Sequence, residues 1–209
     1  MEKRQGSSST TRYPPVLAGA RENSMIPSKT ISPVNAKALI AHARLEKPFY
    51  DALQLAKQLY AKQKRAHSGV EYLSRPLTVA SLLLDHKYAT PVLVAGVLGE
   101  ALVRTTLKPT TLREKFGPEV ADMVELLTPP KEVEGEAWDA YVQRLAAATP
   151  EVQSIKMAEL LEGICALPRK ELSNEFAFLA RCEQIAAAMP MANEELSRRV
   201  MVLIRAARG

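Results

Sequence analysis

Residues 90–106 read TPVLVAGVLGEALVRTT, and this stretch decides the fold class. Apolar side chains fill nearly every position from Val92 to Val103, so a helix here is apolar almost all round. A helix of that kind is buried inside a domain. The pair Thr90-Pro91 suits its start, because proline is favoured in the first turn of a helix. We therefore expect a central buried helix with other helices packed around it.

The sequence on both sides of this stretch also has helical spacing. Arg75-Pro76 opens a helix, and Gly117 followed by Pro118 separates two more. Further helices are predicted over 36–46, 49–64, 134–148, 150–166, 170–188 and 192–207. The alternation typical of strands is absent. The chain is therefore predicted to be all-α and to form one compact helical bundle.

The composition excludes several classes of protein. Of the 209 residues, 47% are hydrophobic and 24% are charged, which is typical of a globular domain. Two cysteines are too few for a disulfide scaffold or a four-cysteine zinc module, and we expect Cys165 and Cys182 to be buried, inert thiols. No apolar run approaches the roughly 18 residues that a membrane helix needs.

The first 35 residues are predicted to be a disordered tail, and residues 36–209 the folded domain. The tail is rich in Ser, Thr and Pro and lacks a periodic apolar pattern, so it cannot bury enough surface to fold. Up to residue 36 it has five basic residues against two acidic ones, which leaves little of the net charge of +5 for the domain. Nucleic-acid binding is therefore not expected. The tail is an ordinary terminus or, alternatively, an export or organelle-targeting signal.

No constellation in the sequence carries chemistry by itself. The three histidines, His42, His67 and His86, have no partner at i+3 or i+4 and are expected at the surface or at helix ends. Phosphate-binding loops and the motifs of serine hydrolases and zinc proteases are also absent. The densest basic cluster comprises Lys57, Lys62, Lys64 and Arg65. It is either a solvated helix face or a phosphate-binding patch.

A longer pattern resembles a known family. Its pieces, in order, are Tyr72-Leu73-x-x-Pro76-Leu77-x-Val79-Ala80, AGVLGEALVRTT, LREKFGPEVADMVELLT and SIKMAELLEGICAL. Together they resemble the hydrolase domain of the RelA/SpoT family and the small alarmone hydrolases, over about residues 50–170. The resemblance implies an all-helical HD-type domain. In that family the domain uses manganese to remove the 3′-diphosphate from (p)ppGpp.

The chain departs from this family at the metal site. By the resemblance, the positions of the metal ligands fall on Tyr60, Gly99, Glu100 and Glu159. By the same resemblance, the family's water-orienting acidic pair falls on Val103-Arg104. Its histidine before a proline falls on Arg75, and its nucleotide-contacting asparagine falls on Gly163.

These replacements remove most of the donors that manganese needs. Glycine offers no side chain, and a neutral tyrosine substitutes poorly for imidazole. Glu100 and Glu159 keep carboxylates, but Arg104 is placed to neutralise one of them, so we expect Glu100 to be the buried partner of a basic group. Weak binding of a hard cation is the alternative, and a shifted register near Tyr60 would bring His67 into the site. We expect no cofactor and lean against an enzyme.

The resulting hypothesis is a catalytically inactive relative of (p)ppGpp hydrolases that binds a guanine nucleotide or a protein partner. The residues expected to bind the ligand are Tyr60, Lys62, Lys64, Arg65 and Lys156, with Arg65 pairing with phosphate or stacking on a base. The alternatives are an active metal-dependent phosphohydrolase and a secreted, effector-type helical interaction protein. We expect a bacterial protein of the cytoplasm that has no membrane partner.

The state of the former metal site separates these hypotheses. An open, positively lined pocket at Tyr60, Glu100 and Glu159 favours ligand binding. A pocket filled by leucines favours an interaction module, and the candidates for filling it are Leu98, Leu102 and Leu160.

Overall fold

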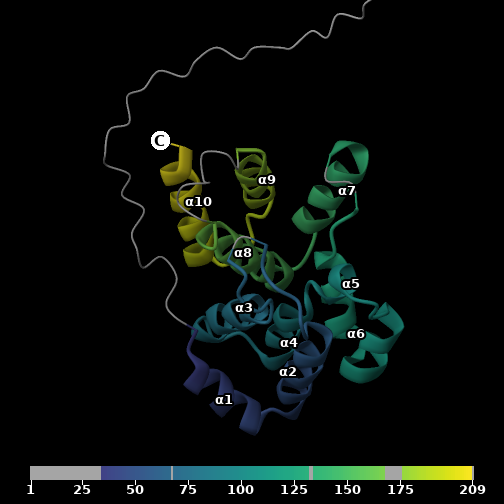
Figure 1. Cartoon of the computed structure of the whole chain (residues 1–209). Helices are drawn as coiled ribbons and strands as arrows, with labels where there is room; N and C mark the ends of the chain where they lie inside the picture. The colour runs from purple at the N-terminus through teal and green to yellow at the C-terminus, as the bar shows by residue number, and fades with distance from the viewer. Residues whose placement is uncertain (1–33, 67, 132–133, 168–175, 209) are drawn as a thin grey trace, which may run out of the picture.

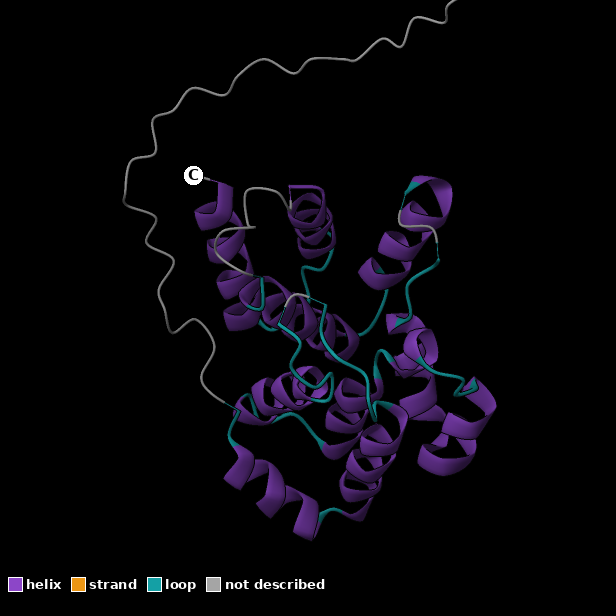
Figure 2. Cartoon of the chain, in the orientation of Figure 1, coloured by secondary structure: helices purple, strands orange, loops and turns teal. Residues whose placement is uncertain are grey.

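The computed structural model describes residues 34–66, 68–131, 134–167 and 176–208, and the regular elements in these ranges are helices (Figures 1 and 2). They are α1 (Ala36–Leu45), α2 (Lys47–Leu59), α3 (Ser74–Asp85), α4 (Thr90–Leu98), α5 (Ala101–Arg104), α6 (Pro109–Leu127), α7 (Gly135–Ala146), α8 (Pro150–Cys165), α9 (Phe176–Ala187) and α10 (Glu194–Arg208). The predicted all-α fold is confirmed. The predicted tail lies outside the described residues up to residue 33.

Helix α4 is the buried helix expected from residues 90–106. Every residue from Val92 to Leu98 is buried, and Thr90-Pro91 forms the first turn. The helix is shorter than predicted, because the chain turns at Gly99-Glu100 before the short α5 begins. Glu100 leaves helical geometry with φ −99° and ψ 2°, and its carbonyl accepts bonds from the next turn. The break directs the Glu100 side chain at neighbouring helices.

Of two other predicted helix boundaries, one is confirmed and one is wrong. Gly117 interrupts α6 with φ 84°, and Pro118 starts a new helical run, as the sequence indicated. Helix α2, in contrast, ends at Leu59 and not at residue 64. Lys62 and Lys64 therefore lie on a loop, where Lys62 takes a positive φ of 64°. The expectation that the basic cluster forms a solvated helix face is wrong beyond Lys57.

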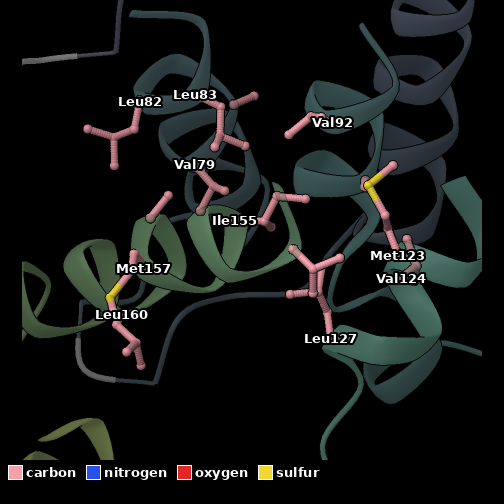
Figure 3. Packing of buried hydrophobic residues seen from close by; sticks show 14 of the residues in the cluster. Val79, Leu82, Leu83, Val92, Met123, Val124, Leu127, Ile155, Met157 and Leu160 are labelled. Carbon is pink, nitrogen blue, oxygen red and sulfur yellow. The ribbon is translucent and has the colours of Figure 1, made fainter. Parts of the chain in front are cut away.

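Helix α8 crosses the middle of the domain. Twelve of its sixteen residues are buried. Figure 3 shows Ile155, Met157 and Leu160 of α8 among apolar side chains of the neighbouring helices. These neighbours include Val79, Leu82 and Leu83 of α3, Val92 of α4, and Met123, Val124 and Leu127 of α6. The aliphatic core thus holds α8 rigidly, and the polar side chains of α8 are fixed with it.

The carboxyl-terminal helices cover the other side of α8. Helix α10 packs along it. The Gln153 amide donates to three carbonyls at the end of α7 and just after it, while its oxygen accepts from Met191 N. Cys182 is buried as expected, but Cys165 at the end of α8 is exposed, so that prediction is wrong. None of the described helices is long and apolar enough to cross a membrane.

Candidate functional site

Three segments meet beside α8, and together with α8 they carry the residues that the sequence singled out. Tyr60 ends α2, Arg75 lies in the first turn of α3, Gly99-Glu100 forms the break after α4, and Glu159 lies on α8. Tyr60, Arg75, Glu100 and Glu159 line one space together with Tyr72 and Val79, and Gly99 lies beside Glu159. The structure therefore brings the predicted metal-ligand positions together.

The Gly99 position is filled by the side chain of Glu159. A Cβ added at Gly99 would lie 2.6 Å from Glu159 Oε1 and 3.3 Å from the carbonyl oxygen of Ala95. Real Cβ atoms do not approach other atoms so closely, so a larger residue at 99 requires Glu159 to move. The carboxylate has taken the volume that a metal-binding side chain at this position would need.

Glu159 is held there by Lys156, one turn earlier on α8. Its carboxylate accepts a bond of 2.5 Å from Lys156 Nζ, and both side chains are buried. Burial acts to lower the pKa of Lys156, but the charge of Glu159 and the contact with Tyr141 outweigh it and raise the pKa. Lys156 is thus a charged partner of Glu159, and it is buried and does not line the space described above.

Two tyrosines close the other side of the same space. The rings of Tyr60 and Tyr72 lie 5.1 Å apart between centroids, and both residues are buried. Neither hydroxyl has a hydrogen-bond partner among the described residues. Burial raises the pKa of Tyr60 further above its ordinary value, and Glu100 and Glu159 add to the shift. A tyrosine kept neutral in this way does not offer an anionic oxygen.

We call the region of Tyr60, Gly99, Lys156 and Glu159 the closed site. The space that remains there is about 10 Å³, no more than one water molecule requires. It is closed by tyrosines, Arg75 and the ion pair, and not by the leucines proposed from the sequence. Leu98 and Leu160 pack in the core, and Leu102 lines a different hollow.

Next to the closed site lies a cluster of arginines. Arg75 donates from Nε to Glu100 at 2.9 Å and also pairs with Glu162, while Arg65 donates to the other oxygen of Glu162 at 2.5 Å. Arg104 donates to the second oxygen of Glu100 at 3.0 Å. The expectation that Glu100 pairs with a basic group is confirmed, although its side chain is 28% exposed and therefore only partly buried.

Two residues beside these arginines were not predicted from the sequence. Glu162 is buried and bridges two arginines, yet it was not singled out. The available signal was its position three residues after Glu159, on the same face of α8. Phe178 of α9 was also missed, because no motif connects that helix with the rest.

The arginines line an open cavity of about 300 Å³, which we call the arginine cavity. Its charged lining comes from Arg65, Arg75, Arg104 and Glu100, and its apolar lining includes Tyr72, Phe178 and Leu167. The Arg104 guanidinium lies 3.9 Å from the centre of the Tyr72 ring, a cation–π contact. Gly163 leaves room for Arg75, because an added Cβ would lie 3.3 Å from its guanidinium.

The loop before α3 places Arg65 at this cavity. Arg65 N donates to Val70 O at 2.9 Å, and Gly69 N donates back to Arg65 O at 3.0 Å with Gly69 at φ 66°. Lys62 and Lys64 of the same loop are exposed and do not line the cavity. Of the five residues expected to bind a ligand, only Arg65 lines this open space.

Glu100 connects the closed site and the arginine cavity. Burial and the nearby charge of Glu159 raise its pKa to about 7, although Arg104 acts to lower it. A carboxyl group with that pKa changes charge near neutral pH. The number of arginine charges left uncompensated in the cavity therefore depends on pH.

The residues of the closed site do not fit a manganese ion. Gly99 has no donor, the Tyr60 hydroxyl is neutral, and both remaining carboxylates are engaged by basic side chains. Within the described ranges, no three His, Cys, Asp or Glu side chains lie together as a metal site. His42 bonds to Thr90 and His86 ends α3, both away from the site, and His67 lies outside the described residues.

Comparisons with known proteins find related sequences and a related structure. A family model described as HD domain matches residues 52–169. The chain is 31% identical over 150 residues to a probable GTP pyrophosphokinase of Mycobacterium leprae, which covers 65% of this chain and 18% of that protein. It is 35% identical over 79 residues to the GTP pyrophosphokinase rsh of Brucella ovis, 38% of this chain and 10% of that protein.

A solved structure shares the fold. It belongs to a metazoan ortholog of SpoT that hydrolyzes ppGpp, and it superposes with a TM-score of 0.68 at 18% identity, covering 78% of this chain and 97% of the other. The resemblance to the RelA/SpoT hydrolase domain is thereby confirmed. The chain spans less than a fifth of the length of the curated relatives described above.

Proposed function

This chain belongs to the HD domain family, and we propose that it is a phosphate-binding member that no longer performs metal-dependent hydrolysis. The observation that carries the proposal is the pairing of Glu159 with Lys156 in the volume beside Gly99. An HD-type hydrolase needs that volume for an ion and its ligands, which activate the attacking water. Here it holds a buried internal ion pair.

The arginine cavity supports binding of an anion. Three guanidinium groups there face two carboxylates, Glu100 and Glu162, so one positive charge is in excess. Each guanidinium has five N–H donors, and Arg65 and Arg104 each use one of them on these carboxylates. Their remaining donors suit the bidentate recognition of a phosphate group.

The ligand we propose is a guanosine polyphosphate. The relatives described above are named for GTP pyrophosphokinase activity, and the structural neighbour hydrolyzes ppGpp. The Phe178 ring at the cavity would provide a surface for a base, as aromatic side chains do in nucleotide-binding sites. The proposal also includes the setting expected from the sequence, the cytoplasm of a bacterium.

Calorimetry and an activity assay test the two parts separately. Titration of the protein with ppGpp, without metal, is expected to give saturable heat. Incubation with ppGpp and manganese is expected to release no pyrophosphate above a protein-free control. Absence of heat from a folded protein would refute nucleotide binding. Manganese-dependent release of pyrophosphate would refute the loss of catalysis and favour the alternative of an active hydrolase.

A further inference from the structure

Helix α1 exposes an unusual amount of apolar surface. Seven of its ten residues are Ala, Leu or Ile, yet only Leu39 is buried. A helix so rich in apolar residues normally buries a broad face against other elements. Figure 1 shows α1 at the periphery of the molecule, with α2 and α3 as its neighbours. Part of its apolar face is therefore left without a partner within the described chain.

That face forms one wall of an apolar groove of about 720 Å³. The floor includes Leu39, Leu53 and Leu77, which also pack against the core. The edges carry large apolar side chains that are open to solvent: Ile40 is 54% exposed, Leu45 82% and Tyr50 50%. Large exposed apolar patches on soluble domains commonly mark sites of protein interaction.

The groove is held in shape by polar contacts at both ends of α1. The Asn35 backbone N–H donates to Ser81 Oγ at 3.0 Å, and the Asn35 side chain caps the helix by accepting from Ala38 N. Near the other end, His42 bonds to Thr90 Oγ1 at 3.2 Å and packs against the Phe49 ring. A groove fixed in this way binds a partner without first being ordered.

The charges around the groove indicate the kind of partner. Residues 34–59 carry four basic side chains and two acidic ones, and Arg44 and Lys47 line the groove itself. Lys47 pairs with Asp51 at 2.5 Å, so Arg44 is the main positive charge on the groove lining. A second copy of the chain related by two-fold symmetry would place this basic patch against itself, which is unfavourable. We propose that the groove binds an amphipathic helix of another protein, with apolar residues on one face and acidic residues beside them.

This inference is independent of the proposed function, because the groove and the arginine cavity have no lining residue in common. The probe is a fluorescein-labelled synthetic helix with leucines at i, i+3, i+4 and i+7 and glutamates elsewhere. Its binding to the full chain is measured by fluorescence anisotropy. We expect a dissociation constant on the order of 10 µM. A sister peptide with lysines in place of glutamates should bind at least about tenfold more weakly.

Substitutions on the protein locate the binding site. Ile40→Asp and Leu45→Asp should each weaken the acidic peptide about tenfold, because each puts an acidic group into the apolar groove. Val202→Asp is the matched control, since Val202 is 43% exposed on α10 and does not line the groove. Leu45 is so exposed that Leu45→Asp should fold normally even if Ile40→Asp does not. Circular dichroism checks the folding of both variants.

Four outcomes would overturn the proposal. They are no binding of the acidic peptide at millimolar concentration, equal binding of the lysine peptide, equal loss with Val202→Asp, and no loss with Leu45→Asp. Analytical ultracentrifugation adds a fifth. A dimer of the unmodified protein that Leu45→Asp dissociates would assign the groove to a second copy of the chain.

Discussion

The closed site and the arginine cavity are neighbours in the same domain, but their charged side chains are arranged differently. In the closed site one lysine and one carboxylate neutralise each other, and about 10 Å³ of space remains. In the arginine cavity three arginines face two carboxylates beside about 300 Å³ of open space. The first arrangement suits stability and the second suits binding, although α8 contributes to both.

The difference follows from burial. Ionic attraction is strong where water is excluded. Removal of one partner from a buried pair therefore leaves an unpaired buried charge, which destabilises the folded state. In the arginine cavity only the pair of Arg104 with Glu100 is well exposed, and such a pair contributes little because water replaces a lost partner. Arg65 and Arg75 are 18% and 20% exposed and share the buried Glu162, so they resemble the closed site in this respect. Substitutions in the closed site should therefore change the free energy of unfolding, and a substitution of Arg104 in the arginine cavity should mainly change ligand affinity.

The largest expected effect is on stability and comes from Lys156→Met. The substitution leaves Glu159 buried without its partner, which should lower the free energy of unfolding by about 3–5 kcal/mol. Urea denaturation followed by circular dichroism measures this.

The matched control is the double variant Lys156→Met with Glu159→Leu. It removes both charges and should recover at least half of the loss, since apolar replacement of a buried ion pair is often neutral. A loss below about 1 kcal/mol in the single variant would mean that water reaches Glu159. In that case the closed site is not closed, and the contrast with the arginine cavity disappears.

The next effect concerns affinity and comes from Arg104→Ala. Arg104 is about half exposed and bonds to Glu100, so its loss should change the free energy of unfolding by less than about 1 kcal/mol. Affinity for ppGpp should fall by at least about tenfold, the usual worth of a charge-assisted bond. Calorimetry measures this, with Arg198→Ala as the control for an exposed arginine paired elsewhere. Equal affinities of the two variants would exclude Arg104 from the ligand site.

Most of the fold was predictable because apolar periodicity and helix-start signals act locally. The all-round apolar character of residues 92–98 indicated the buried α4, and Gly117-Pro118 marked the kink in α6. The end of α2 was missed, since no glycine or proline marks Leu59 as its last residue. There the chain turns into a loop that is closed by bonds between its two ends, such as the bond of Tyr72 N to Gln63 O.

The sequence predicted which residues form the site, but not which side chains they pair with. The family pattern indicated that Tyr60, Gly99, Glu100 and Glu159 would meet, and they do. The pattern did not indicate that Lys156 turns inward to Glu159, because a lysine beside a carboxylate on a helix is usually a surface pair. Pairings across helices, such as Arg65 with Glu162, depend on packing that local sequence does not encode.

A smaller effect is a dependence of anion binding on pH. Burial and Glu159 raise the pKa of Glu100 to about 7, so this carboxyl is mostly protonated at pH 6 and mostly ionised at pH 8. The protonated form no longer competes for Arg75 and Arg104, so sulfate should bind up to about tenfold more tightly at pH 6. Sulfate keeps its charge over this range, which makes calorimetry at both pH values a direct measure.

Glu100→Gln identifies the group responsible. Glutamine is neutral at every pH, so the variant should bind sulfate equally at pH 6 and pH 8, near the affinity of the unmodified protein at pH 6. A pH dependence that persists in this variant would assign the effect to another titratable group. The arginine cavity would then be a site of constant charge, and Glu100 would not couple it to the closed site.

The smallest effect compares two buried tyrosines. The Tyr60 hydroxyl in the closed site has no partner among the described residues, whereas the Tyr141 hydroxyl donates to Leu127 O at 2.9 Å. Tyr60→Phe should therefore raise the free energy of unfolding by about 0.5–1 kcal/mol, because it removes a buried polar atom that bonds to nothing. Tyr141→Phe should lower it by about 1 kcal/mol through the lost bond. Urea denaturation of both variants measures the difference. If Tyr60→Phe also destabilises the protein, the hydroxyl has a partner, and the remaining space in the closed site holds a bound water molecule.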